Sequence, residues 1–119
     1  MALEDASRST RSVNAIWVLR GSDNDGAVTF RVPYGTSKTV GRAPRADFVL
    51  KAALVSRLHC RIVGGDQRME VEDLSSTNGT FVNDKRIDKG HLASGDRLRI
   101  GRVELKVERL TRRAATEAR

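Results

Sequence analysis

Hydrophobic and polar residues alternate in short runs along most of the chain, and turn-forming residues end each run. The alternation is clearest near the C-terminus, where Val103, Leu105 and Val107 share one side of an extended chain and Glu104 and Lys106 share the other. A period of two residues is the pattern of a β-strand with one buried face. On this basis we expect strands at residues 16–20, 27–32, 38–41, 47–50, 59–63, 69–74, 80–82, 97–101 and 103–110.

Glycine, proline, aspartate and asparagine separate these runs. The segment GSDNDG at residues 21–26 is a cluster of turn-forming residues, and Pro33 and Gly35 follow the second run. No stretch has a strong helical period, and we find no internal repeat. Many short strands with turns at regular intervals predict an all-β sandwich or barrel.

The strand pattern stops near both ends of the sequence. Residues 1–14 and 112–119 are polar and carry no period, so we expect a disordered N-terminal tail and a basic, flexible C-terminal tail around a single domain at 15–111. A chain of 119 residues suits one small domain. The sequence has no apolar run of about 18 residues that would span a membrane. Its first residues also lack the apolar segment of a secretory signal.

The chain is strongly basic, with a formal net charge of +7, which favours an anionic partner. The charge is concentrated in residues 40–61, where the net charge alone is +4. The charged residues of this stretch are Arg42, Arg45, Lys51, Arg57, Arg61 and the acid Asp47.

Cysteine and histidine are too few for a disulfide framework or a simple metal centre. Cys60 is the single cysteine, so no internal disulfide can form, which fits a reducing compartment. Together with His59 and His91 it would still need carboxylates to complete a structural zinc site. We therefore expect no metal and no cofactor, and we interpret Cys60 as a small buried residue.

Catalysis has little support in the sequence, and we expect the protein not to be an enzyme. Ser56 and His59 have the side chains of a nucleophile and a base, but a triad also needs an orienting acid and an oxyanion hole. The G-x-S-x-G elbow, the Walker loop and the H-E-x-x-H motif are all absent from the sequence.

A small anion site is better supported. Arg42 follows a glycine at the end of an expected strand, and its planar guanidinium can hold two phosphate oxygens. Ser56, Arg57, Thr77 and Asn78 add hydroxyl, guanidinium and amide donors.

Nucleic acid, the other anionic partner, is usually bound by several cations interleaved with stacking aromatics. Aromatic residues make up only 4% of this chain. We expect Trp17, Phe30, Phe48 and Phe81 to lie in the core and only Tyr34 to lie in a loop.

Four short groups occur in order between the expected strands: Gly41-Arg42, the tetrapeptide SRLH at 56–59, the segment LSSTNGTFVN at 74–83, and Gly95-Asp96. In this order and spacing they resemble the forkhead-associated (FHA) domain, over about residues 16–110. S-x-x-H followed by S-T-N-G-T-F-V-N is specific, whereas G-R or G-D alone is not. The resemblance implies a β-sandwich of two twisted sheets with recognition loops at one end. It also implies a non-catalytic module that binds phosphothreonine peptides.

The resemblance also implies roles for single residues. Phosphate contacts fall to Arg42, Ser56, Arg57 and Thr77, and contact with the peptide main chain falls to Asn78. The residues expected to shape the loops are Gly41, His59, Gly79 and Asn83.

Local chemistry supports such a loop in the segment at 74–83. Serine, threonine and asparagine side chains can close turns with nearby backbone groups, so we expect Ser75–Asn78 to form a self-bonded turn. Gly79 is expected to supply a backbone angle that other residues resist.

Several polar residues also have plainer interpretations. His59 is better read as a hydrogen-bonded structural group than as a ligand or base, and Gly95-Asp96 as a turn before a strand. Lys85, Arg86 and Lys89 are expected on a solvated edge, with peptide contact as the alternative.

The first functional hypothesis is therefore a phosphothreonine-dependent interaction module, part of a larger signalling protein. The alternative is a basic nucleic-acid-binding β domain, supported by charge alone, and we expect no membrane partner. The family resemblance implies DNA-damage or cell-cycle signalling and residence in the nucleus, with the cytoplasm as the alternative. Arg113 precedes Thr116 by three residues, a spacing that a basophilic kinase would accept, so phosphorylated Thr116 is a candidate for self-association.

Overall fold

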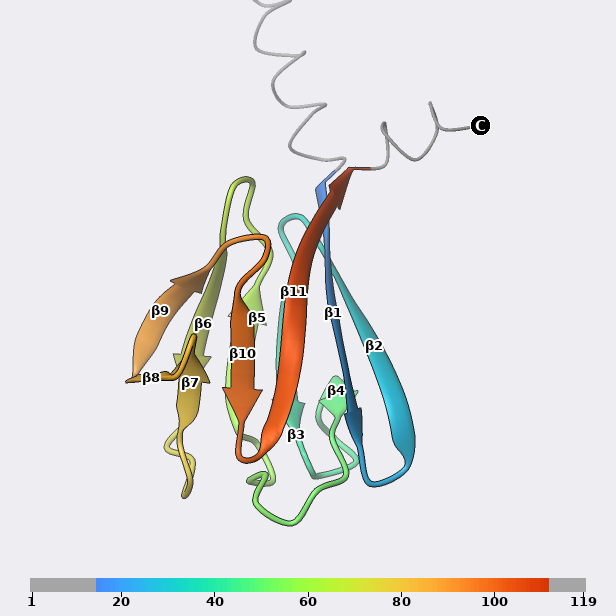
Figure 1. The fold of residues 1–119 in the computed structure, drawn as a ribbon, viewed down its shortest axis with the longest axis vertical. Coiled ribbons are helices and arrows are strands. Elements are labelled where there is room, and N and C mark those ends of the chain that lie inside the picture. Colours follow the sequence, from blue (N-terminus) through green and yellow to red (C-terminus); the bar gives the residue numbers. More distant parts are fainter. Residues whose placement is uncertain (1–14, 112–119) are drawn as a thin grey trace, which may run out of the picture.

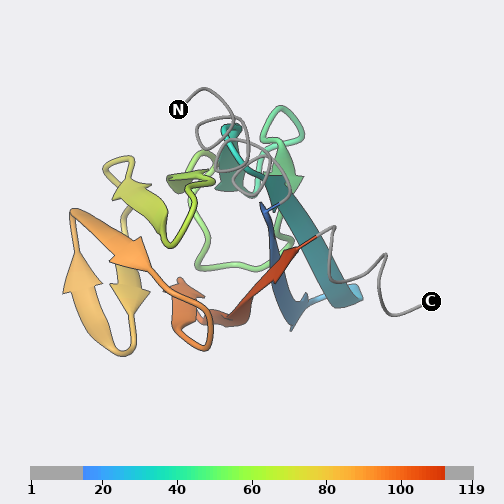
Figure 2. The ribbon, with the colours of Figure 1, turned by 90° about the horizontal axis from the view of Figure 1, so that it is seen from above.

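The computed structural model describes residues 15–111, which form two β-sheets packed face to face (Figures 1 and 2). The predicted all-β sandwich is confirmed, and the described part of the chain contains no helix. Both predicted tails, 1–14 and 112–119, lie outside the described residues, as does Thr116.

The first sheet has six strands and the second has five. In spatial order the first contains β2 (Gly26–Pro33), β1 (Ala15–Asp23), β11 (Val103–Thr111), β10 (Arg97–Ile100), β7 (Thr80–Val82) and β8 (Lys85–Ile87). The second contains β4 (Phe48–Val49), β3 (Ser37–Gly41), β5 (Cys60–Val63), β6 (Met69–Asp73) and β9 (Lys89–Leu92). Neighbouring strands are antiparallel except for β3 and β4, which are parallel.

The core lies between the sheets and is built from alternate residues of each strand. Trp17 and Leu19 on β1 and Leu105 on β11 face Ile62 and Val71 of the opposite sheet, and all five are fully buried. Burying one such side chain contributes about 1.5–3 kcal/mol. The indole Nε1 of Trp17 donates to the carbonyl oxygen of Gly65 at 2.8 Å, so this buried ring leaves no donor unpaired.

Three sequence expectations need correction. The charged strand β8 and the glycine-containing strand β9 were not predicted, because their residues lack an apolar alternation. β8 lies at the edge of its sheet, where charged side chains are tolerated and discourage pairing with another chain. Residues 21–26 are not all turn, since β1 continues to Asp23 before a tight turn.

The aromatic residues also divide differently from the prediction. Phe30 and Phe48 stack on each other with ring centroids 4.5 Å apart, and both pack against the core. Phe81 does not: Val82 beside it points inward, so Phe81 points outward and lies under the guanidinium of Arg99. Tyr34 is 40% exposed, as expected of a loop residue.

Strand order brings distant loops together at one end of the sandwich. We call three of them the recognition loops: residues 42–47 between β3 and β4, 50–59 between β4 and β5, and 74–79 between β6 and β7. They lie at the lower end in Figure 1, while the first and last described strands begin and end at the upper end.

Candidate anion-binding site

Gly41 ends β3 where this strand meets the backbone of the second recognition loop. A Cβ on Gly41 would overlap the carbonyl oxygen of Arg57, so only glycine allows this approach. The backbone N–H of Arg42 donates to the oxygen of Ser56 at 2.9 Å, and that of His59 donates to the oxygen of Val40 at 2.8 Å. The close approach therefore sets Arg42 beside Ser56.

The side chain of Arg42 is exposed but anchored at one point. Its Nε donates to the carbonyl oxygen of Val55 at 3.1 Å. An arginine has five N–H donors, so the four on the terminal nitrogens stay available to a ligand. Since the Nε contact orients the guanidinium, less rotamer entropy is lost when an anion binds.

Ser56 and Asn78 join the second and third recognition loops. The Oγ of Ser56 accepts the backbone N–H of Thr77 at 3.1 Å, so its own proton is free to be donated. The Nδ2 of Asn78 donates to the oxygen of Leu54 at 3.0 Å, which leaves one amide N–H and the amide oxygen for a ligand.

Thr77 and Arg57 complete the predicted set. Both side chains are exposed, and neither has a hydrogen-bond or ion-pair partner within residues 15–111. The structure thus brings together Arg42, Ser56, Arg57, Thr77 and Asn78, which come from three loops, at one end of the sandwich.

The third loop is held by Asp73, which the sequence analysis did not single out. Its carboxylate accepts the backbone N–H of Ser76 at 3.0 Å, the hydroxyl of Ser76 at 2.5 Å and the hydroxyl of Thr80 at 2.7 Å. The Oγ of Ser76 in turn accepts the N–H of Gly79 at 2.9 Å. The predicted self-bonded turn is therefore closed from outside by Asp73. An aspartate three residues before a serine, as in D-L-S-S, is the signal that would have revealed it.

The pKa of Asp73 is consistent with its role as a hydrogen-bond acceptor in this loop. Burial would raise the pKa of its carboxyl, but the hydrogen bonds from Ser76 and Thr80 outweigh burial and lower the pKa. Two backbone angles in the loop are left-handed, φ 58° at Ser75 and 92° at Gly79, so the predicted conformational role of Gly79 agrees with its backbone.

His59 links two recognition loops from below the surface. It is fully buried; its Nδ1 accepts the backbone N–H of Ser56 at 3.0 Å, and its Nε2 lies 2.8 Å from the oxygen of Gly79. These partners assign a neutral ring whose Nε2 carries the proton. Burial lowers the pKa of His59, and the Gly79 bond and the nearby Asp73 only partly oppose this effect. Its contacts are those of a structural group.

Asn83 lies away from the anion site, at the other end of β7. Its Nδ2 donates to a carboxylate oxygen of Asp96 at 3.0 Å, and its Oδ1 accepts the backbone N–H of Arg97 at 2.9 Å. The remaining oxygen of Asp96 accepts the N–H of Ala93 at 2.7 Å. These bonds, which we call the Asp96 network, tie the β7–β8 turn to the β9–β10 loop and support a loop-shaping role for Asn83.

The arginines at the anion site are not paired with an acid, and the carboxylate of the first recognition loop binds Thr39 instead. Asp47 in the first loop accepts the backbone N–H of Thr39 at 2.8 Å and its hydroxyl at 3.2 Å, and these bonds lower the pKa of the carboxyl. Arg42, Arg45 and Arg57 have no carboxylate within 4.0 Å among the described residues.

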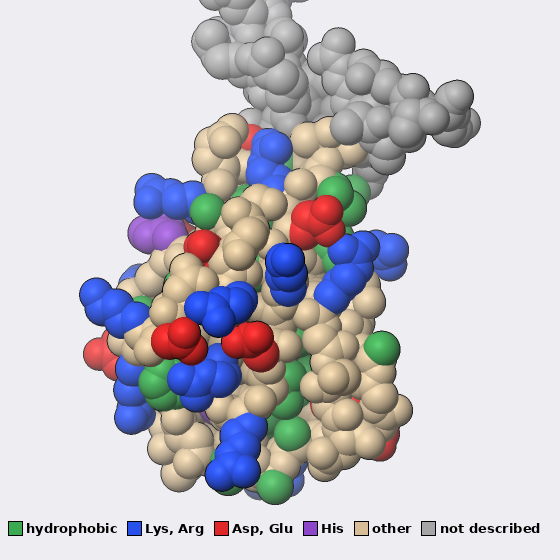
Figure 3. Space-filling view, viewed as in Figure 1, with side chains coloured by type: hydrophobic (Ala, Val, Ile, Leu, Met, Phe, Trp, Pro, Cys, Tyr) green, Lys and Arg blue, Asp and Glu red, His purple; other side chains and the backbone are tan. Residues whose placement is uncertain are grey.

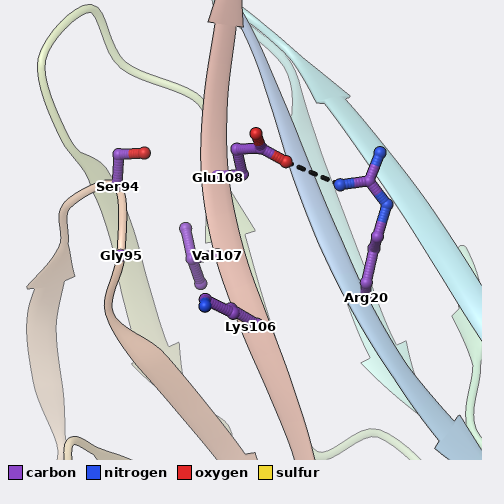
Figure 4. A pocket seen from close by; sticks show the side chains of 6 residues that line it. All are labelled: Arg20, Ser94, Gly95, Lys106, Val107 and Glu108. Atoms are coloured by element: carbon purple, nitrogen blue, oxygen red, sulfur yellow. Dashed lines mark hydrogen bonds and ion pairs between the residues drawn. The ribbon is translucent and has the colours of Figure 1, made fainter.

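A separate hollow of about 440 Å³ lies on β11 and the β9–β10 loop (Figure 4). Arg20 and Glu108 at its rim form an ion pair at 2.6 Å, so much of its charge is already neutralised. Within residues 15–111 no three His, Cys, Asp or Glu side chains gather as a metal site requires, and no helix is long and apolar enough to cross a membrane.

Two curated proteins are similar to this chain in sequence. The ABC transporter ATP-binding/permease protein Rv1747 of Mycobacterium tuberculosis is 39% identical over 80 residues, 67% of this chain and 9% of that protein. The glycogen accumulation regulator GarA of Mycolicibacterium smegmatis is 36% identical over 96 residues, 79% of this chain and 58% of the regulator. The chain thus spans less than two thirds of the length of either curated relative.

A solved structure agrees in sequence and in fold. It belongs to a structural and functional analysis of phosphothreonine-dependent FHA domain interactions. It is 36% identical with a TM-score of 0.69, covering 79% of this chain and 95% of that one. The family model described as FHA domain matches residues 38–101, which include all three recognition loops. The chain belongs to the FHA domain family.

Proposed function

We propose that this domain binds phosphothreonine in a partner protein and that Arg42 and Ser56 hold the phosphate. FHA domains are phosphothreonine-dependent interaction modules rather than enzymes, and we extend both statements to this chain. The observation that carries the proposal is the pair formed by an Arg42 guanidinium anchored only at Nε and a Ser56 hydroxyl whose proton is free.

The remaining donors suit the rest of a phosphopeptide. Arg57 and Thr77 offer further contacts to phosphate oxygens, and the free amide groups of Asn78 suit the peptide main chain, which presents one donor and one acceptor per residue. A charge-assisted bidentate contact is stronger than a neutral one, so Arg42 should dominate the affinity.

The wider role rests on the relatives. Because this chain matches only part of each curated relative, we propose that it serves as the phosphopeptide-reading part of a signalling protein. The relatives named above come from mycobacteria, which have no nucleus, so they do not support the expectation of nuclear residence or of DNA-damage and cell-cycle signalling. The nucleic-acid alternative is not supported by the family.

The test is a calorimetric titration with a peptide selected from an oriented phosphothreonine library. The phosphothreonine form should bind, the unphosphorylated form should hardly bind, and duplex DNA should not displace the phosphopeptide. DNA displacement with a steep fall of log affinity against log salt would instead identify a nucleic-acid surface. Equal binding of the phosphorylated and plain peptides would refute the proposal.

A further inference from the structure

The outer face of the six-stranded sheet carries two arginines that stand on either side of one aromatic ring. Phe81 on β7 is in register with Arg99 on β10 and with Arg86 on β8. The guanidinium carbon of Arg99 lies 4.0 Å from the centroid of the Phe81 ring, a cation–π distance. We call these three residues the Arg99–Phe81–Arg86 row.

The row adjoins the third recognition loop. A Cβ placed on Gly79 would lie 2.9 Å from Nε of Arg86 and 3.1 Å from a ring carbon of Phe81. The side chain of Arg86 therefore occupies the space that the missing Cβ leaves free. Its guanidinium lies against Gly79. Gly79 follows Asn78, which we expect to contact the peptide main chain, so Arg86 lies next to the expected path of a bound peptide.

The acids on this face are already paired with other arginines, Glu108 with Arg20 at 2.6 Å. Arg97 pairs with Asp84 at 3.1 Å and with Glu104 at 3.7 Å. Within residues 15–111 neither Arg86 nor Arg99 forms an ion pair. Figure 3 shows this face, where blue basic side chains outnumber red acidic ones. Two cations without ion-pair partners, one on each side of Phe81, would attract the carboxylates of an acidic ligand.

We propose that the Arg99–Phe81–Arg86 row binds carboxylates of an acidic segment flanking the phosphothreonine, and thereby selects partners with Asp or Glu beside the phosphorylated residue. This rests on the proposed function, since the phosphate in the recognition loops delivers the segment to the row. Strands in a sheet are about 4.8 Å apart, so the backbones of Arg99 and Arg86 are about 10 Å apart. Alternate residues of an extended peptide repeat at about 7 Å, within reach of two long arginine side chains.

The experiment compares three phosphothreonine peptides of equal length by fluorescence anisotropy. One carries a run of glutamates after the phosphothreonine, one carries the run before it, and one has glutamines at all these positions. One of the glutamate peptides should bind about 3- to 10-fold more tightly than the glutamine peptide, as expected for two exposed ion pairs. The gain should shrink as salt is raised.

Variants of the row then test whether its arginines cause the gain in affinity for the glutamate peptide. Arg86→Gln with Arg99→Gln should abolish it while leaving affinity for the glutamine peptide unchanged, and Arg86→Lys with Arg99→Lys should keep part of it. Arg99→Gln alone, which leaves the contact at Gly79 intact, should lose part of the gain. Lys106→Gln removes another exposed charge from the sheet and should leave the gain unchanged. An undiminished gain in the double Gln variant, or no gain in the wild type, overturns the proposal.

An amide NMR titration with the glutamate peptide lacking phosphate separates the two proposals. Shifts at Phe81, Arg86 and Arg99 without any phosphate-dependent affinity would overturn the proposed function and keep the row as a carboxylate-binding surface. Phosphate-dependent affinity without these shifts and without a glutamate preference would keep the function and overturn the surface.

Discussion

The recognition loops and the Asp96 network are built from the same residue types, and in each an aspartate accepts several hydrogen bonds. Asp73 accepts bonds from Ser76 and Thr80, and Asp96 accepts bonds from Asn83 and Ala93. Serine, asparagine and glycine occur beside both. The composition of a loop therefore explains how it is held, but not whether it binds a ligand.

The two regions differ in what is left unpaired. In the Asp96 network the nearby cation Arg97 is engaged by Asp84 and Glu104, and Asn83 uses both its amide nitrogen and its amide oxygen. At the recognition loops, Arg42 and Arg57 have no carboxylate partner among the described residues. Unpaired hydrogen-bond donors on rigid loops favour anion binding, because the loops have already lost their conformational entropy before the anion binds.

Replacing the two aspartates tests this comparison most strongly. Asp73→Ala removes the acceptor of three hydrogen bonds, and we expect it to lower the free energy of unfolding by about 3 kcal/mol and to abolish phosphopeptide binding. Asp96→Ala should cost about 1–2 kcal/mol and leave affinity per folded molecule unchanged. Urea unfolding and calorimetry measure both quantities.

The milder Asp73→Asn keeps the shape of the side chain and guards against simple failure to fold. It should weaken binding while the domain still unfolds cooperatively. If Asp96→Ala impaired binding as much as Asp73→Asn, the functional division between the two regions would be wrong.

Arg42→Ala should come next in size, with an affinity loss of about 10- to 100-fold and almost no change in stability. A charge-assisted contact is worth about 1.5–3 kcal/mol, and the guanidinium is exposed. Arg42→Lys should rescue poorly, because an ammonium lacks the planar fork. Arg45→Ala is the matched control, an exposed cation of the same loop, and should change affinity by less than about threefold. Unchanged affinity in Arg42→Ala would remove it from the site.

His59→Ala should affect the fold more than the ligand. The substitution strands the N–H of Ser56 and the oxygen of Gly79, at a cost of about 1–3 kcal/mol. The melting temperature should fall clearly, while affinity per folded molecule falls less. A variant as stable as the wild type that no longer binds would place His59 in the site itself.

The same histidine predicts a pH dependence of stability. The pKa of His59 in the folded state is below its ordinary value of 6.5, so below that value the unfolded chain binds more protons. Stability is therefore retained above about pH 6.5 and falls as the pH decreases through the range below it. His59→Gln should flatten this slope in urea titrations between about pH 7 and about pH 5.5. The Asp73 carboxyl, whose pKa is lowered, affects stability only at more acidic pH.

The sequence predicted most of the fold because alternation records burial directly. Val103, Leu105 and Val107 alternate with charges and are buried as expected. Phe81 was placed in the core by its hydrophobicity, yet β7 has only three residues, so the alternation is too short to say which face Phe81 occupies. Arg99 on the neighbouring strand stabilises the ring at the surface. That contact depends on strand order, which the local pattern of residues does not contain.

The candidate site was predictable in part. Motif spacing pointed to Arg42, Ser56 and Asn78, and the structure places them on adjoining loops. The bonds that hold them could not be derived in the same way. Asp73 acts through residues three and seven positions later, and His59 through a carbonyl 20 residues away.

The smallest expected effect is the preference for phosphothreonine over phosphoserine. It concerns the surface between the unpaired donors of the recognition loops. The two phosphates are alike, so Arg42 and Ser56 cannot distinguish them. Discrimination has to come from the threonine methyl group, which we expect to contact the loop ending at Ser56 and the Thr77-Asn78 segment. One buried methyl is worth about 0.8 kcal/mol, about fourfold in affinity.

Threonine should gain further because its χ1 is already restricted, so less rotamer freedom is lost on binding. The void left by phosphoserine also forfeits dispersion contacts. We therefore expect a preference of several-fold at least, reaching more than about tenfold. One peptide made with phosphothreonine and with phosphoserine, titrated at two salt concentrations, measures it. Because a methyl contact is uncharged, the ratio of affinities should not change with salt, whereas both affinities should fall. Equal affinities would mean that no apolar contact exists beside Ser56 and that this end of the domain reads charge alone.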